Sequence, residues 1–248
     1  MSSTPTPPPP PPPPAPDLTA RAASGPFANV GTLSKAVAVL VAIAAGFTVA
    51  AAVISAGVVS DAEAFLAGDI DDDAFESAIG ALSGVQSLGL IFQLAAGVVT
   101  ILWMYRIAAN LRRADRATTW NPLFAVFGWI LPPLLFVIPF LMLRELWKAS
   151  DRTALGDRWR AGAENAALWA WIVAFGVLPA LIELAQIDRL ADQGLPTGNL
   201  DSVAETIRDN STIDLVSAAL TAAAAVAWIV VVRQLTARHT AFTGEARD

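Results

Sequence analysis

The polar side chains best suited to bind a ligand lie in one stretch of the chain, residues 101–152. Arg106 and Asn110 are four positions apart, so they share one face of a helix. A guanidinium attracts a carboxylate, and we therefore expect Arg106 to pair with Glu145 across a small pocket on the cytoplasmic side. The candidate set combines polar, proline and tryptophan side chains of this stretch: Arg106, Asn110, Trp129, Pro132, Pro139, Arg144, Glu145 and Trp147.

Two interpretations of this set are open. In the first, Asn110 and Trp129 line the pocket, and the spare arginines bind anionic lipid headgroups or a protein partner. In the second, the set is a structural lock, in which an ion pair and tryptophan anchors hold the segment at the membrane surface. We favour the lock, because the usual excess of arginine in cytoplasmic loops already accounts for these arginines.

No residue pattern typical of a catalytic or metal site accompanies this set. The only histidine, His239, lies near the C-terminus, and the chain has no cysteine, no GxxxxGK[ST] phosphate loop and no HExxH motif. Asp69, Asp71 and Asp73 begin like an EF-hand calcium loop, but Ala74 stands where the glycine turn is needed. We therefore expect a protein that is not an enzyme and has neither a metal nor a cofactor.

The composition indicates a membrane protein. The chain is 55% hydrophobic and 15% charged, with a mean hydropathy of +0.54, whereas soluble domains carry about 25% charged residues. A net charge of −6 argues against a nucleic-acid partner. Several near-uncharged runs reach the roughly 20 residues that cross a bilayer as a helix. The sequence predicts an all-α membrane protein with four transmembrane helices, at about residues 36–59, 84–108, 166–187 and 213–232.

A fifth apolar segment, residues 122–143, is long enough to cross, at ~33 Å if fully helical. Within it, Pro132, Pro133 and Pro139 each remove an amide donor, and both of its flanks are basic. If it does not cross and the N-terminus is inside, 14 cations lie inside and 2 outside, both of them in the acidic loop 188–212, because the acidic loop 60–83 has none. If it crosses, the split is 8 to 8. Because cytoplasmic loops are rich in Lys and Arg, we predict a proline-broken re-entrant or interfacial helical hairpin and two cytoplasmic termini.

These patterns divide the chain into a proline-rich tail (1–34), a membrane domain (35–235) and a short C-terminal tail (236–248). The first tail contains eight consecutive prolines, Pro7–Pro14, and we expect it to be disordered with a polyproline II run. It is either a docking rod for a proline-binding protein or a low-complexity spacer. We favour the spacer, because a pure proline run lacks the flanking residues of a defined ligand.

The order of residues in the central stretch resembles the core of a known family. The matching residues are Trp103, Tyr105, Arg106, Asn110, Trp120, Pro122, Gly128, Trp129, Pro132, Pro139, Arg144, Glu145, Trp147, Ala149 and Ser150. This pattern is similar to the family catalogued as domain of unknown function 4328, multi-pass membrane proteins of actinobacteria and relatives. One departure is Leu135, where that family usually has an asparagine between two prolines. The resemblance implies a membrane location and a topology, but no activity, because none is established for the family.

We expect a multi-pass protein of the bacterial cytoplasmic membrane that acts as a non-catalytic scaffold or accessory protein. Its contacts to lipid or to a partner would involve residues 101–152. A transporter or channel for a small solute or ion is the first alternative, but it needs polar residues continuous across the bilayer. A membrane enzyme acting on a lipid-like substrate is the weaker alternative, because it needs a clustered acid and base.

Overall fold

The computed structural model describes residues 26–129, 137–193 and 199–245, and for residues 187–193 it describes the backbone alone. Within these ranges the chain is helical and contains no strand, which confirms the predicted all-α class. The elements in chain order are α1 (Gly31–Ala67), α2 (Asp72–Arg113), α3 (Phe124–Phe127), α4 (Val137–Ala149), the 3-10 helix η2 (Gly156–Ala161), α5 (Ala166–Ile172), the π-helical turn η3 (Val173–Val177), α6 (Leu178–Gln193) and α7 (Leu200–Thr243).

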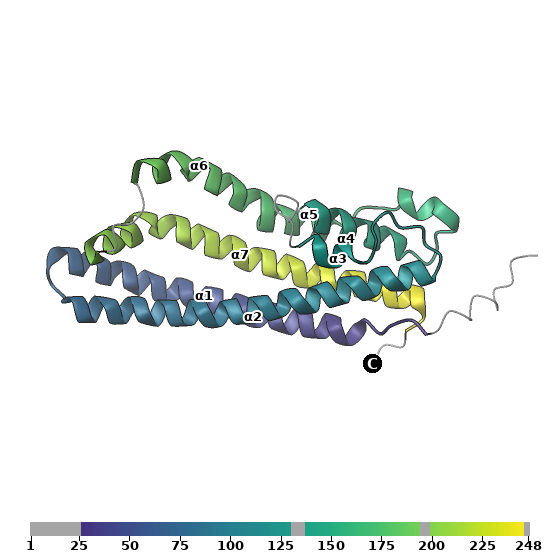
Figure 1. Cartoon of the computed structure of the whole chain (residues 1–248), viewed down its shortest axis with the longest axis horizontal. Helices are drawn as coiled ribbons and strands as arrows, with labels where there is room; N and C mark the ends of the chain where they lie inside the picture. The colour runs from purple at the N-terminus through teal and green to yellow at the C-terminus, as the bar shows by residue number, and fades with distance from the viewer. Residues whose placement is uncertain (1–25, 130–136, 194–198, 246–248) are drawn as a thin grey trace, which may run out of the picture.

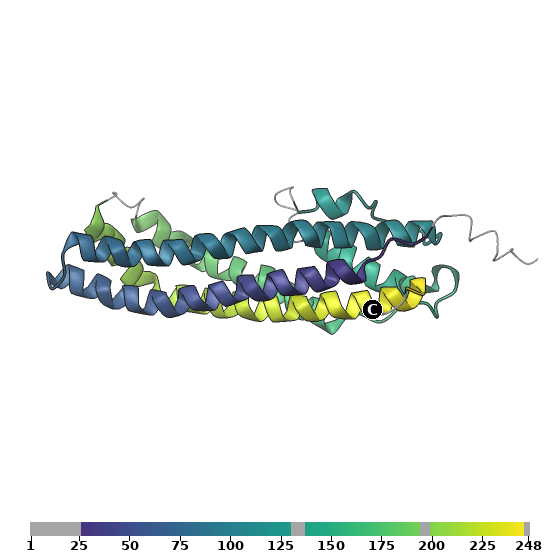
Figure 2. The same cartoon turned by 90° about the horizontal axis from the view of Figure 1, so that it is seen from below.

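Four of the described helical stretches are long and apolar enough to cross a membrane, which confirms the predicted number of transmembrane helices. Three are the single helices α1, α2 and α7, which lie side by side along the molecule (Figures 1 and 2). The fourth, Ala166–Gln186, runs through α5, η3 and α6. Its wide turn η3 ends just before Pro179, whose missing amide cannot bond the carbonyl four residues earlier.

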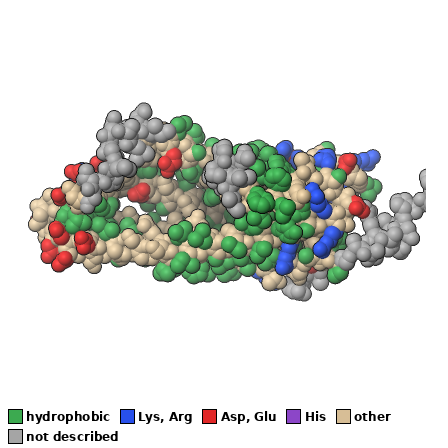
Figure 3. All heavy atoms as spheres, in the orientation of Figure 1, with side chains coloured by type: hydrophobic (Ala, Val, Ile, Leu, Met, Phe, Trp, Pro, Cys, Tyr) green, Lys and Arg blue, Asp and Glu red, His purple; other side chains and the backbone are tan. Residues whose placement is uncertain are grey.

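The long helices continue well beyond the apolar spans. The 44 residues of α7 correspond to ~66 Å of helix, about twice the ~30 Å hydrocarbon core of a bilayer. The extensions of α1, α2 and α7 pack together at the end of the molecule where acidic side chains gather (Figure 3), around buried Val58, Ala62, Phe75 and Ala204. Residues 60–83 and 200–212, which the sequence analysis treats as loops, are therefore mostly helical.

Lysine and arginine side chains gather at the opposite end of the molecule, which we call the basic end (Figure 3). The N-terminus of α1, the C-termini of α2 and α7, and all of α3, α4 and η2 lie there (Figure 1). The main hydrophobic core also lies toward this end and includes Trp103, Leu111, Leu146 and Leu235. The candidate site residues are thus built onto the best-packed part of the protein.

The described parts of residues 122–143, which are 122–129 and 137–143, lie at the basic end as two legs that each contain a helical stretch. The turn predicted between them falls on residues 130–136, outside the described residues, and stays a prediction. The first leg holds α3 and the second begins α4, and Gly128 and Ile138 from the two legs lie against each other. Pro139, at the third position of α4, is buried in a first turn where a missing amide costs no helical bond. Pro132 and Leu135 lie outside the described residues, so their predicted roles stay predictions.

We expect Gly128→Ala to destabilise the hairpin. An added Cβ would lie 2.7 Å from the carbonyl oxygen of Phe124 in the same leg and 2.8 Å from Ile138 Cγ2 in the other, so both the local turn and the contact between the legs would have to shift. The overpacking should cost ~1–2 kcal/mol, measured as a lower midpoint of thermal unfolding in detergent. Gly97→Ala is the matched control, because a Cβ there meets no atom within 4 Å. Equal stability of the two variants would contradict a close approach of the legs.

Candidate functional site at the basic end

Asn110 lies in the last turns of α2, where it ties the N-terminal segment to the helix bundle. It follows Trp103 and Ile107 on the buried face of α2 and is itself fully buried. Its Oδ1 accepts from the backbone N–H of Ala28 at 2.9 Å, and its Nδ2 donates to the carbonyl of the same residue at 2.8 Å. Residues 26–30 of the predicted disordered tail are therefore packed against α2, and the first helix already begins at Gly31.

The second Nδ2 hydrogen of Asn110 points to His239, whose Nε2 lies 3.2 Å away. Because the two bonds to Ala28 fix the orientation of the amide, Nε2 must be the acceptor and the imidazole must carry its proton on Nδ1. This Nδ1–H then donates to Ser150 Oγ, at 3.1 Å. Asn110, His239 and Ser150 are all fully buried and together form what we call the polar lock, which joins α2, α7 and the end of α4.

The sequence predicts an apolar span at about residues 213–232 of α7, and His239 lies seven residues beyond that span. Burial disfavours the charged imidazolium and lowers the pKa of His239 from 6.5 to about 4. The imidazole is consequently neutral at physiological pH, in agreement with its role as both donor and acceptor in the polar lock.

The chain of hydrogen bonds from Ser150 through His239 to Asn110 resembles a hydrolytic triad. The proton of the imidazole, however, is on the nitrogen that faces the serine. A general base must face the nucleophile with an unprotonated nitrogen, whereas the nitrogen facing Ser150 is the protonated Nδ1. Ser150 is also fully buried. The arrangement can therefore hold helices together but cannot activate Ser150. Nor does any group of three His, Asp or Glu side chains in the described ranges lie close enough to hold a metal ion.

The structure does not bring Arg106 and Glu145 together, and the predicted ion pair between them is wrong. Arg106 donates to the carbonyl of Asn29 at 2.9 Å. Glu145 accepts from the backbone N–H groups of Thr119 and Trp120 at 2.7 and 3.2 Å. Each side chain thus serves a nearby backbone: Arg106 holds the N-terminal segment, and Glu145 holds the loop after α2.

Arg144 and Lys148, one turn apart on α4, both bind Glu164, which precedes α5. Arg144 Nε donates to Glu164 Oε2 at 2.7 Å, and Lys148 Nζ lies 2.6 Å from Oε1. The hydrogen bonds from Arg144, together with Lys148, lower the pKa of Glu164 to about 2. The cations of α4 are therefore used to dock the next transmembrane segment.

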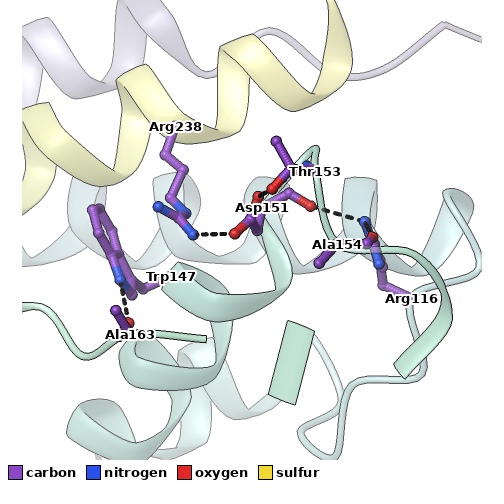
Figure 4. Close-up of polar contacts among 7 residues, drawn as sticks. All are labelled: Arg116, Trp147, Asp151, Thr153, Ala154, Ala163 and Arg238. Carbon is purple, nitrogen blue, oxygen red and sulfur yellow. Dashed lines mark hydrogen bonds and ion pairs between the residues drawn. The ribbon is translucent and has the colours of Figure 1, made fainter. Parts of the chain in front are cut away.

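Asp151, just after α4, is held from three sides (Figure 4). Its carboxylate accepts from Thr153 N and Oγ1 at 2.9 and 2.7 Å and pairs with Arg238 of α7 at 2.8 Å. Its carbonyl accepts from Arg116 Nη2 at 2.9 Å. The bonds from Thr153, and the nearby arginines, hold the pKa of Asp151 below its ordinary value. Asp151 thus joins the loop after α2, the end of α4 and α7.

Trp147, on α4, contacts Arg238 of α7 as Asp151 does (Figure 4). Its indole N–H donates to the carbonyl of Ala163 at 3.0 Å, and the guanidinium of Arg238 lies over its ring at 4.5 Å. Such a cation–π contact contributes about 0.5–1 kcal/mol at an exposed position. Trp147 thus connects α4 to the segment before α5 and to α7.

Trp129 does not lie beside Arg106 and Asn110, as the pocket interpretation predicts. It lies toward the middle of the bundle, where its ring meets Trp171 at 6.3 Å and Trp228 at 6.5 Å between centroids. Trp171 and Trp228 are themselves 4.8 Å apart. The three rings form what we call the tryptophan cluster, which fills the space between the first hairpin leg, α5 and α7.

Sequence reasoning missed several residues that complete this end of the protein: Ala28, Arg116, Asp151, Glu164, Arg238, His239 and Glu245. The C-terminal segment is the largest omission, because α7 continues to Thr243 through a region predicted as a tail. Beyond it, the Glu245 carboxylate accepts from the backbone N–H groups of Val30 and Gly31 at 3.2 Å. An anion at the N-terminus of α1 satisfies donors that have no intrahelical partner.

The protein is an α-helical membrane protein with four apolar helical spans. Its basic end is a structural cap, in which hydrogen bonds join the N-terminal segment, α2, α4 and α7. The chain belongs to the family named Domain of unknown function (DUF4328), whose model matches residues 68–237, and the predicted resemblance is thereby confirmed. Comparison with curated proteins and with solved structures gave no match.

Proposed function

We propose that the protein is a non-catalytic scaffold or accessory protein of the bacterial cytoplasmic membrane, whose basic end faces the cytoplasm and binds anionic lipid headgroups. The observation that carries the proposal is that the arginines at this end form two groups: one bonds other parts of the chain, and the other is exposed and makes no such bond. Arg106, Arg116, Arg144 and Arg238 are engaged with the chain's own carbonyls and carboxylates. Their contacts make the surface rigid without using all of its charge.

A second group of arginines at the same end is exposed and can bind the phosphate groups of lipids. These side chains are exposed and, in the part of the chain that the structure describes, bond no other residue: Arg112, Arg152, Arg158 and Arg233. Each cation near an anionic leaflet contributes about 1 kcal/mol of attraction, so four correspond to ~4 kcal/mol at moderate ionic strength. A rigid surface of unpaired arginines next to the apolar spans suits phosphate-bearing headgroups.

The lipid test compares the full chain with a variant in which these four arginines are changed to glutamine. The purified proteins are mixed in detergent with phosphatidylglycerol, and bound lipid is counted by native mass spectrometry. We expect retention of phosphatidylglycerol to fall at least tenfold in the variant. Arg208→Gln, at the acidic end, is the control and should retain the wild-type amount. Unchanged retention in the fourfold variant would refute the proposal.

The orientation is tested with single cysteines, since the chain has none of its own. Ser60 lies at the acidic end and Ala163 at the basic end, and both are exposed. In intact cells an impermeant thiol reagent should label Ser60→Cys but label Ala163→Cys only after lysis. Labelling of Ala163→Cys in intact cells would reverse the proposed orientation.

One observation supports the transporter alternative, and another argues against it. A cavity lined by Gln93 does lie among the transmembrane helices. Toward the basic end, however, its extension is lined by the tryptophan cluster, and the fully buried Trp103, Met104 and Ile107 of α2 follow. Such packing favours a binding cavity over a continuous pathway.

A further inference from the structure

A cavity of about 720 Å³ lies between α1, α2 and α7, in the half of the molecule nearer the acidic end. Figure 3 shows the surface of this half hollowed between the acidic end and the hydrophobic middle. Its lining mixes apolar and polar side chains, among them Phe47, Ser55, Gln86, Gln93, Asp214 and Ser217. The volume is within the range of about 300–1,000 Å³ typical of ligand pockets.

A second cavity of about 260 Å³ continues from the first, because Thr48 and Gln93 line both. It is mostly apolar and reaches the tryptophan cluster. The fourteen residues from Asp214 in the first cavity to Trp228 in the second correspond to ~21 Å of helix α7. Half of a bilayer's hydrocarbon core is ~15 Å, so the joined cavities can hold the hydrocarbon chain of a lipid from one leaflet.

Three polar side chains in the first cavity have no partner among the residues that the structure describes. Gln86, Gln93 and Asp214 make no side-chain hydrogen bond in the described ranges. Gln93 is thirteen residues, or ~20 Å, from Arg106 at the basic end of α2, which places it inside the hydrocarbon layer. An unpaired amide at that depth is costly, so a ligand that hydrogen bonds there is favoured.

The charge of the lining narrows the chemistry of the headgroup. Among the described residues that line the first cavity, Asp214 is the one charged side chain, and it lies nineteen residues, or ~28 Å, from Arg233 at the basic end. It is therefore near the outer edge of the apolar span, where a headgroup would be. A carboxylate there attracts an ammonium group and repels a second anion.

We propose that the joined cavities bind an amine-bearing membrane lipid. Its ammonium group pairs with Asp214, the polar part of its head and glycerol region hydrogen bonds Gln86 and Gln93, and one hydrocarbon chain extends to the tryptophan cluster. This site is at the opposite end from the exposed arginines and has the opposite headgroup preference. It therefore does not depend on the function proposed for the basic end.

The experiment uses the full chain in detergent with phosphatidylethanolamine as the probe and native mass spectrometry as the readout. We expect one bound copy per protein. Asp214→Asn should weaken retention about tenfold or more, as expected for loss of a hydrogen bond between charged groups. Glu183→Gln removes an acid from α6 outside the cavity and should change nothing. Phosphatidylglycerol bound at the arginines should be unaffected by either change.

A second pair of variants tests whether the lipid occupies the first cavity. Ala218 lines the cavity, whereas its neighbour Ala219 does not. Ala218→Phe should abolish binding of phosphatidylethanolamine, and Ala219→Phe should leave it intact. Wild-type retention by Ala218→Phe, or equal retention by wild type and Asp214→Asn, overturns the proposal. If a variant does not fold, a wild-type thermal midpoint that phosphatidylethanolamine fails to raise overturns it as well.

Discussion

Replacing Asn110 with alanine should destabilise the protein by ~2–4 kcal/mol and free its N-terminal segment. The change leaves the N–H and the carbonyl of Ala28 and the Nε2 of His239 without partners. Each unsatisfied buried group costs about 1–3 kcal/mol, and release of residues 26–30 to water recovers part of the loss. Unfolding in detergent measures the stability, and hydrogen exchange measures the release of the segment.

Asn121→Ala is the matched control for this variant. Asn121 is exposed and its side chain bonds only the nearby backbone N–H of Leu123 at 3.0 Å, so its loss should cost well under 1 kcal/mol. In Asn110→Ala the amide of Ala28 should exchange much faster than in wild type, whereas in the control it should not. Protection of Ala28 in Asn110→Ala would show that the N-terminal segment is held by something else.

The four spans and the hairpin could be predicted because the bilayer imposes simple constraints. A crossing helix must be apolar over about 20 residues, and the charge of the flanks reports its orientation. Those constraints say nothing about where a helix ends once it leaves the membrane. α1 continues to Ala67 and α7 begins at Leu200 because Ala62 and Ala204, outside the apolar spans, pack with Phe75 and with Val58 at the end of the first span.

A signal for these extensions was present in the spacing of buried residues. Val58, Ala62 and Phe65 recur at intervals of four and three, which keeps the apolar face of α1 running into the acidic segment. On α7, Trp228, Val232 and Leu235 lead to His239 at the same intervals. The charges beside these positions suggested a loop and a tail, but the helical periodicity identifies the buried face.

The sequence predicted which residues contribute to the site better than it predicted which partners they bond. Arg106, Asn110, Arg144, Glu145 and Trp147 all form hydrogen bonds that join segments of the basic end. Their partners are largely backbone groups or lie in segments whose register sequence alone does not define. Arg106 and Glu145 were matched by charge, but both are surrounded by backbone groups that form hydrogen bonds without an opposite charge.

Because buried His239 is neutral, the free energy of unfolding should fall as the pH is lowered from 6.5 to 4. Its pKa is about 4 when folded and 6.5 when exposed, so in this window the unfolded chain binds a proton that the folded chain does not. Lowering the pH therefore favours unfolding, by ~3 kcal/mol once the pH is below both values. Protonation of Nε2 would also remove the acceptor that Asn110 uses and set the new Nε2–H donor against the Nδ2–H donor of Asn110.

The measurement is the thermal midpoint in detergent at pH 7 and pH 5, for wild type and for His239→Asn. Glu164, with a pKa of about 2 when folded and 4.5 ordinarily, contributes stability that is lost only as the pH falls through that lower range, so it does not interfere above pH 5. The wild type should lose stability between the two pH values, and His239→Asn should lose much less, whatever its stability at pH 7. Ser150→Ala retains the imidazole and should keep the wild-type pH dependence. An equal loss in His239→Asn would assign the titration to another group and leave the polar lock without a role in it.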